Sequence, residues 1–445
     1  MGEELRAFST VSHSPVPQEC DASVDSAAIK EDCLSTDNSQ DSGDEPLWLI
    51  NLRPNMITRL YVDNFRCLSN FEVKFAPLTI LLGANGSGKS ACLGLLAGLR
   101  DLILGKTNVA ILCPEESRTR WDKRIEQAFE LGVRLDEGDF LYRLVVIHLP
   151  HPNPRRQSIF VHIQEETLSV DGKQLYRANM DDVRVYNDRG EESAPLLPDW
   201  QISGISRIHE RFDNLKLIAF REFMGKVPII ALNPYAVNPA TREKEPVELP
   251  AVDCGNFADF ISNLIVSDAQ VMRPVEEALR NGPLPDFLAF EAQLSGDVRV
   301  VYCLFSKQGS SALRFRLDEL SSGQIATVIL QTVATFVEKH EGALVLDEPG
   351  NFLAISEMEP FLARLQELAL EQNRQVIIST HHPVAIDFLA AGHGLWFERD
   401  AAGPTRVPVK LHMQDEGDPE NSYLRVSDLI ARGWLSGIGV QELTH

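Results

Sequence analysis

The residues with the clearest chemical pattern form a glycine-rich loop that matches G-x-x-x-x-G-K-[ST]: Gly83, Ala84, Asn85, Gly86, Ser87, Gly88, Lys89 and Ser90. Glycines let such a loop fold into a nest of backbone N–H groups that point at phosphate oxygens. A helix that starts at the loop presents its positive end to the same anion. We expect Lys89 to reach the β- and γ-phosphates of a nucleotide and the Ser90 hydroxyl to bind Mg²⁺.

Two carboxylates follow an apolar run much later in the chain. Residues 343–346 are apolar, and Asp347 and Glu348 come directly after them. An aspartate at the end of a buried strand is the usual second Mg²⁺ ligand of a phosphate-loop site, and we expect that role of Asp347. Glu348 is placed to orient or deprotonate the attacking water. An acidic turn after an apolar strand is commonplace, so this prediction depends on the phosphate loop.

Two shorter motifs have both a structural and a functional interpretation. Residues 320–324 read Leu-Ser-Ser-Gly-Gln before a helical pattern, so the serines either cap a helix or, with Gly323, bind an anion at its N-terminus. His381 follows the apolar run 375–379. A histidine at a strand end is usually structural, but this one is placed to contact a γ-phosphate and to respond to its loss.

The elements that must position these residues alternate between strands and helices. Apolar runs that predict buried strands lie at 78–82, 343–346 and 375–379. Segments with helical spacing lie at 89–104, 324–340 and 356–372. This alternation predicts an α/β protein whose parallel sheet is covered by helices on both faces. Residues 140–149 and 159–168 alternate in polarity and predict further strands joined by a tight turn.

In this order, the four motifs resemble those of the ABC-type ATPase family: Walker A at 83–90, the signature at 320–324, Walker B at 344–348 and the switch histidine at 381. The stretch from Ile57 to the phosphate loop is similar to the start of proteins in the soluble RecF/SMC/OLD-like branch of this family. Within that branch, the chain resembles a stand-alone AAA family ATPase. The resemblance implies a head with a mostly parallel sheet flanked by helices, an antiparallel β lobe and an inserted α+β region.

The resemblance also implies roles for individual residues. Ser322 and Gly323 would contact the γ-phosphate bound by the Walker A loop of a second subunit. ATP and Mg²⁺ would then be sandwiched in a homo-oligomer, either a dimer of heads or a larger assembly. Glu348 and His381 would act in hydrolysis. Arg66 matches a position that helps to hold the nucleotide in some relatives, or else it is a surface turn residue; no Q-loop glutamine is assigned.

The chain is expected to divide into a tail and a head. Residues 1–46 contain eleven acidic and two basic side chains and few aromatics, which predicts a disordered acidic tail. Residues 47–445 would form the ABC-type ATPase head, with an insertion at about 111–225 and a signature-helix subdomain at about 238–340. After the ATPase motifs, the stretch from 397 onward is too short for a Toprim nuclease.

Basic side chains in the expected insertion alternate with acidic ones. Arg118, Arg120, Lys123 and Arg124 lie among Glu115, Glu116, Asp122 and Glu126, a pattern typical of a salt-bridged exposed helix. Arg155 and Arg156, in a proline-rich turn, are better candidates for phosphate contact.

Composition restricts the function. The 445 residues have a formal net charge of −22, which disfavours a protein that coats DNA or an anionic membrane. Seven cysteines without a C-x-x-C pair and no long apolar stretch predict a cytoplasmic protein that is not embedded in a membrane.

Four functions are compatible with these motifs to different degrees. The first is an ATP-hydrolysing molecular switch that gates a separate effector, a nuclease or toxin, in bacterial antiviral (anti-phage) defence. The alternative is a RecF-like DNA repair or recombination ATPase, which would need a local basic channel for nucleic acid. A transporter's energising subunit and a non-catalytic scaffold are less favoured, the scaffold because Lys89, Asp347, Glu348 and His381 are all present.

Overall fold

The computed structural model describes residues 54–150, 159–193, 199–241, 246–295, 298–307, 311–390, 392–399, 403–410 and 425–431. All of them belong to one compact unit, Asn51–His445. The expected acidic tail at 1–46, and Arg155 and Arg156, lie outside the described residues. No helix in the described ranges is long and apolar enough to cross a membrane.

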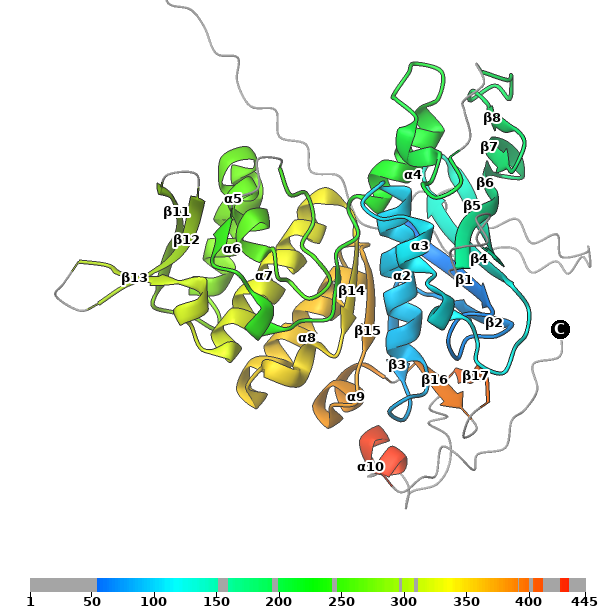
Figure 1. Ribbon diagram of the computed structural model, residues 1–445. Helices are drawn as coiled ribbons and strands as arrows, with labels where there is room; N and C mark the ends of the chain where they lie inside the picture. Colours follow the sequence, from blue (N-terminus) through cyan, green and yellow to red (C-terminus); the bar gives the residue numbers. More distant parts are fainter. Residues whose placement is uncertain are drawn as a thin grey trace, which may run out of the picture. The chain divides into compact units, whose positions relative to one another are not determined.

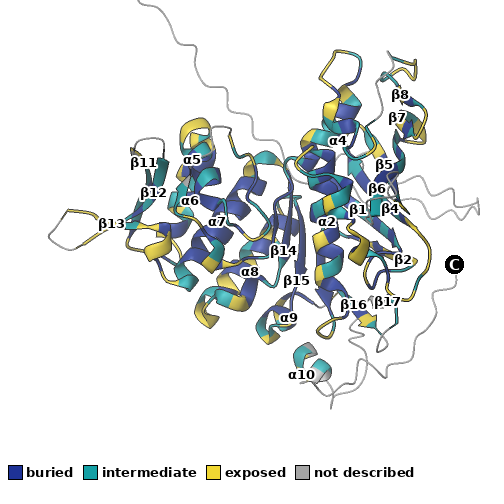
Figure 2. Ribbon diagram, viewed as in Figure 1, coloured by how far each residue is buried: buried dark blue, intermediate teal, exposed yellow. Residues whose placement is uncertain are grey.

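A six-stranded sheet carries the motif residues. Its strands, in spatial order, are β17 (Thr405–Lys410), β16 (Gly394–Arg399), β3 (Leu78–Leu82), β15 (Gln375–Ser379), β14 (Ala343–Asp347) and β9 (Ile229–Ile230). Neighbours from β16 to β9 are parallel, and only β17 at the edge is antiparallel. Its central strands are buried on both faces, which explains their continuous apolar runs (Figure 2).

The two faces of this sheet pack into two separate cores. The helices in the described part of the chain are α2 (Lys89–Ile103), α3 (Val109–Leu112), α4 (Leu215–Met224), α5 (Phe257–Ser267), α6 (Ala269–Arg280), α7 (Ser322–His340), α8 (Ile355–Leu370), α9 (Pro383–Leu389) and α10 (Val426–Ala431). Leu81 of β3 packs in one core with residues of α2 and α4, whereas Ile80 packs in the other with residues of α5 to α8 (Figure 1). Alternation along one strand therefore divides the helices into two layers.

The largest sheet is antiparallel, so the expectation of a mostly parallel architecture needs correction. Its seven strands, in spatial order, are β2 (Phe71–Lys74), β1 (Met56–Asp63), β4 (Glu126–Leu135), β5 (Gly138–Pro150), β6 (Ile159–Val170), β7 (Lys173–Asn179) and β8 (Val183–Val185). Tight turns such as 171–172 join several of these strands, and a connection that short permits only antiparallel pairing. Strands from the expected insertion thus pair directly with β1. The coarser prediction of an α/β fold is confirmed.

A third, small sheet lies in the segment before α7. It contains β10 (Ala240–Thr241), β12 (Val298–Phe305) and β11 (Phe287–Ser295) in that order, and β13 (Leu313–Arg316) also pairs with β12. Single turns of 3₁₀-helix complete the description: η1 (Glu115–Ser117), η2 (Ile205–Arg207), η3 (Pro234–Ala236), η4 (Leu317–Glu319) and η5 (Pro349–Phe352). The segment expected to hold the signature helix therefore contains strands as well as helices.

Candidate functional site

The phosphate loop lies between β3 and α2 and owes its shape to glycine. Gly83 and Gly88 have φ angles of 140° and 108°, which side chains on L-residues rarely allow. A Cβ atom at Gly83 would lie 2.2 Å from the carbonyl oxygen of Phe397, and one at Gly88 would lie 2.5 Å from Oγ1 of Thr405. The loop can therefore fit against β16 and β17 only with glycine at both positions.

Lys89 is folded back into the loop that precedes it. Its Nζ donates hydrogen bonds to the carbonyl oxygens of Gly83, at 2.7 Å, and Ala84, at 3.3 Å. Burial lowers the pKa of Lys89, while the negative charges of Glu348 and Asp347 oppose that shift. The cation is thus held in a partly desolvated place where an anion would interact strongly.

The loop also contains a polar atom that has no protein partner. The Ser87 side chain is 3% exposed, and its buried Oγ makes no hydrogen bond. A buried hydroxyl without a partner is costly, and a ligand oxygen in the loop would offer one. This orphaned hydroxyl and the glycine-lined cradle fit a bound phosphate group.

The two carboxylates lie where the neighbouring parallel strands end. Asp347 is directly opposite Ser379 of β15, whose Oγ donates a hydrogen bond to Oδ1 of Asp347. Glu348 follows with φ 52° and ψ 52°, a left-handed conformation that costs a residue with a side chain roughly 1–2 kcal/mol. The Glu348 backbone N–H donates to the carbonyl oxygen of Ser379 at 3.0 Å, which fixes this turn. Backbone strain of this kind is common at functional positions.

Glu348 and His381 are brought together by the ends of β14 and β15. Oε2 of Glu348 accepts a hydrogen bond from the backbone N–H of His381 at 3.1 Å and lies 2.7 Å from Nδ1 of the same residue. The glutamate side chain is 19% exposed and the histidine 58%. The carboxylate is therefore oriented by two contacts while the imidazole faces the solvent-accessible side.

A cleft of about 670 Å³ joins most of the predicted site residues. Those that line it are Arg66, Asn85, Gly86, Ser87, Gly88, Lys89, Ser90, Glu348 and His381. Gly83, Ala84 and Asp347 are not among the lining residues, although the first two hold the Lys89 ammonium. Residues more than 290 positions apart in the chain are thus assembled around the phosphate loop.

The signature residues are not part of this cleft. Ser321 caps α7 by accepting a hydrogen bond from the Gln324 N–H, and the Gln324 side chain accepts one from the Ser321 N–H, so a capping box is present. Ser322 and Gly323 begin the helix and are partly exposed, near η5 rather than the phosphate loop. The capping interpretation is correct, and the exposed N-terminus of α7 remains accessible.

Sequence reasoning missed one wall of the cleft, formed by residues 116–121. Glu116, Arg118, Arg120 and Trp121 line the cleft, together with Arg399 of β16. The expected salt-bridged helix here is wrong: a single 3₁₀ turn is followed by a loop that leads into β4. Pro114 precedes the turn, and the chain is already paired with β5 from Glu126 onward.

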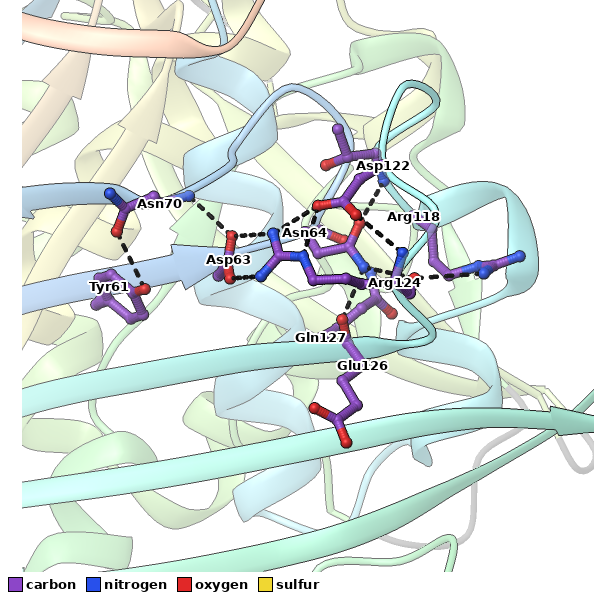
Figure 3. Close-up of polar contacts among 10 residues, drawn as sticks. Tyr61, Asp63, Asn64, Asn70, Arg118, Asp122, Arg124, Glu126 and Gln127 are labelled. Atoms are coloured by element: carbon purple, nitrogen blue, oxygen red, sulfur yellow. Dashed lines mark hydrogen bonds and ion pairs between the residues drawn. The ribbon is translucent and has the colours of Figure 1, made fainter.

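Asn64 holds the loop at 116–125 in place through hydrogen bonds to its backbone. Its fully buried side chain donates hydrogen bonds to the carbonyl oxygens of Arg124, at 3.0 Å, and Glu126, at 2.7 Å (Figure 3). Its Oδ1 accepts one from the N–H of Thr119 at 3.1 Å. Asn64 also adopts φ 63°, a conformation that asparagine tolerates better than most residues. The sequence signal, a single asparagine after a strand, is too common to reveal this role.

A second set of contacts closes the loop on its outer side. The guanidinium of Arg124 bonds both oxygens of Asp63, at 2.5 and 3.0 Å, and also Asp122 (Figure 3). The hydrogen bond from Arg124 holds the pKa of Asp122 below its usual value. Two ion pairs among the alternating charges exist, Arg118–Glu115 and Arg124–Asp122, but they lie in the 3₁₀ turn and the loop after it and not on an α-helix. The additional pair between Arg124 and Asp63 ties that loop to β1.

Arg66 lies next to the same loop. Its backbone N–H donates to the carbonyl oxygen of Ser117 at 2.6 Å, and its guanidinium lies 5.4 Å from the ring centroid of Phe65. Arg66 has φ 52° and an exposed side chain that lines the cleft. Arg66 is therefore a turn residue whose side chain faces the candidate nucleotide site.

Comparisons with known proteins agree with these motifs. A family model described as an AAA ATPase domain matches residues 56–127, from β1 to the start of β4. The OLD nuclease of Thermus scotoductus is 23% identical over 350 residues, which cover 75% of this chain and 60% of that protein. The resemblance to ATPases of the ABC/SMC/OLD-like type is thereby confirmed. The chain spans 60% of the length of this relative.

Solved structures of SMC heads are also similar. The SMC head domain from Thermotoga maritima has a TM-score of 0.41 and 14% identity, covering 80% of this chain and 99% of that one. The Smc head with an extended coiled coil, bound to the C-terminal domain of ScpA from Pyrococcus furiosus, has a TM-score of 0.47 and 11% identity. That match covers 80% of this chain and 96% of the other.

Proposed function

We propose that this protein binds and hydrolyses ATP and acts as a molecular switch. The observation that carries the proposal is the meeting of Lys89, Glu348 and His381 in one cleft at the phosphate loop. A phosphate-binding cation and a group that orients or deprotonates water are central to phosphoryl transfer, and the imidazole adds a hydrogen-bonding group beside them. A cleft of about 670 Å³ is within the range usual for small-molecule sites.

Each residue has a defined part in this proposal. Lys89 exchanges the two carbonyl oxygens that it contacts for phosphate oxygens, and the loop N–H groups with the Ser87 hydroxyl hold the same anion. Ser90 and Asp347 would hold Mg²⁺, which neutralises phosphate charge when it is bound. Mg²⁺ prefers six oxygen ligands, so phosphate oxygens and water would complete its coordination.

Glu348 is proposed to orient and deprotonate the attacking water. Its Oε2 is occupied by the two His381 contacts, which leaves Oε1 to accept a proton. His381 would then contact the γ-phosphate from its exposed edge and transmit its loss to the Glu348 carboxylate. A positioned general base typically increases the rate of such a reaction about 10²–10⁴-fold.

A second copy of the chain is proposed to complete the site. Ser322 and Gly323 start α7 outside the cleft of their own chain, and a helix N-terminus binds anions. A head-to-tail dimer would bring this N-terminus to the nucleotide of the partner. We further propose that opening and closing of such heads gates a separate effector, a nuclease or toxin in antiviral defence; the OLD nuclease relative motivates this step.

Replacing the candidate base tests the proposal. Glu348→Gln keeps the size of the side chain and removes its proton-accepting carboxylate, so phosphate release should fall about 10²–10⁴-fold while ATP still binds. Light scattering with ATP and Mg²⁺ should then show a stable dimer or larger species. Glu359→Gln, at an exposed position of α8, is the matched control and should behave as the parent protein.

Two outcomes would contradict the proposal. Unchanged turnover in Glu348→Gln would mean that another group activates water, and the role of Glu348 would be wrong. A parent protein that binds no ATP, measured by calorimetry with Mg²⁺ present, would overturn the nucleotide function itself.

A further inference from the structure

The phosphate loop makes no contact that distinguishes one nucleotide base from another. Any preference for a base must therefore come from the other wall of the cleft, residues 116–121 with Arg399. Backbone N–H groups and Lys89 interact with phosphates, which all nucleotides share. Away from the phosphate loop, the cleft is lined by several charged side chains, by Cys67 and by one large aromatic residue, Trp121. Trp121 is 45% exposed, so a ligand in the cleft can reach its ring.

Trp121 is paired with a cation from a distant part of the chain. Cζ of Arg399 lies 5.8 Å from the centroid of the Trp121 ring. Arg399 is itself anchored, because its Nε donates to the carbonyl oxygen of Gly403 at 2.8 Å and its Nη1 to that of Gly86 at 3.4 Å. The arginine therefore links the tip of the phosphate loop to the indole ring.

The loop that carries Trp121 is held in place although its tip is exposed. Asn64 bonds the backbone on both sides of Trp121, at Thr119 and Arg124. Asp122, which directly follows Trp121, accepts a hydrogen bond from Arg124, and Arg124 also donates one to Asp63 of β1 (Figure 3). An aromatic ring on a fixed loop loses little conformational entropy when a flat ligand stacks on it.

We propose that Trp121, supported by Arg399, is the base-recognising platform of this cleft and selects a purine nucleotide. A base stacks on an aromatic ring with about 1–3 kcal/mol, and a purine covers more of an indole face than a pyrimidine does. The adjacent guanidinium adds a cation–π contribution to the same stack. This inference rests on the proposed nucleotide function and adds the residue that distinguishes the bases.

Binding of ATP, CTP and inorganic tripolyphosphate, each with Mg²⁺, tests the platform by calorimetry. The parent protein should bind ATP more tightly than CTP or tripolyphosphate. Trp121→Ala should weaken ATP binding roughly 5- to 150-fold, the equivalent of one base stack, and leave tripolyphosphate binding unchanged. Trp121→Phe should recover most of the lost affinity.

Trp200→Ala is the matched control, since this tryptophan is 49% exposed and lies outside the cleft. It should leave both affinities at the parental value. Equal losses for ATP and tripolyphosphate in Trp121→Ala, or no loss of ATP affinity, would overturn the platform while the phosphate site stands. A parent protein that binds neither ATP nor tripolyphosphate would overturn the proposed function, and the platform with it.

Discussion

Replacing Asn64 by alanine should both destabilise the protein and make the cleft wall at 116–121 more mobile. Asn64 is fully buried and makes no contact with the cleft, yet it bonds the loop at Thr119, Arg124 and Glu126. Alanine removes all three hydrogen bonds and leaves the buried N–H of Thr119 without its partner. It also places a residue with a side chain, and no local hydrogen bond, at φ 63°.

The magnitude follows from these contacts. Three hydrogen bonds at about 0.5–1.5 kcal/mol each amount to roughly 1.5–4.5 kcal/mol of unfolding free energy. The left-handed backbone adds about 1 kcal/mol for alanine but not for glycine. Asn64→Ala should therefore lose about 2.5–5.5 kcal/mol, and Asn64→Gly about 1 kcal/mol less.

Urea denaturation of the parent and both variants measures these free energies, and nucleotide titration shows the effect on the cleft. Weaker ATP binding with unchanged tripolyphosphate binding is expected, because the loop carries Trp121 and not the phosphate loop. If Asn64→Ala stays within about 0.5 kcal/mol of the parent, as ordinary surface substitutions do, the anchoring argument is refuted. If glycine is no better than alanine, the backbone part of the argument fails.

Two further predictions concern the β lobe and the phosphate loop. Burial, with a smaller contribution from Arg118, lowers the pKa of His148 to about 4, so the folded protein keeps this imidazole neutral. The contribution of the neutral imidazole to stability is complete above the ordinary histidine pKa of about 6.5 and is lost as the pH falls from there toward about 4. Between about pH 7.5 and about pH 5, the free energy of unfolding in urea should therefore fall less in His148→Gln than in the parent protein. Gly88→Ala should abolish ATP binding and lower stability, because its Cβ would lie 2.5 Å from Oγ1 of Thr405 at φ 108°. Normal ATP affinity in a folded Gly88→Ala protein would show that the loop tolerates a side chain there.

Part of the candidate site can be predicted from local pattern. The phosphate loop needs consecutive residues, a preceding strand and a following helix, and each of these is visible in the sequence. The apolar runs before Asp347 and His381 predicted the strands β14 and β15, because strands buried on both faces must be continuously apolar. The cap at Ser321 is equally local, since it involves residues only three positions apart.

The tertiary structure alone decided which charges face the nucleotide cleft. Arg118 and Arg124 have the same type and similar neighbours in the sequence, yet Arg118 lines the cleft and Arg124 is bound by Asp63 of a distant strand. Arg399 reaches Trp121 across nearly 280 positions of chain. No local periodicity encodes such pairings, because they depend on the order of strands in two different sheets.

The sequence by itself therefore determined which groups lie at the phosphate-loop side of the cleft. They are a glycine-rich loop, a lysine, two carboxylates and a histidine, placed at the ends of parallel strands. The antiparallel pairing of β1 with β4 determined the opposite wall, because it brings Asn64 beneath the loop that carries Trp121. The physical reason is that the pattern of polarity and the preference for strand, helix or turn are local properties of a chain, whereas a wall made of three separate segments exists only after long-range hydrogen bonds have joined them.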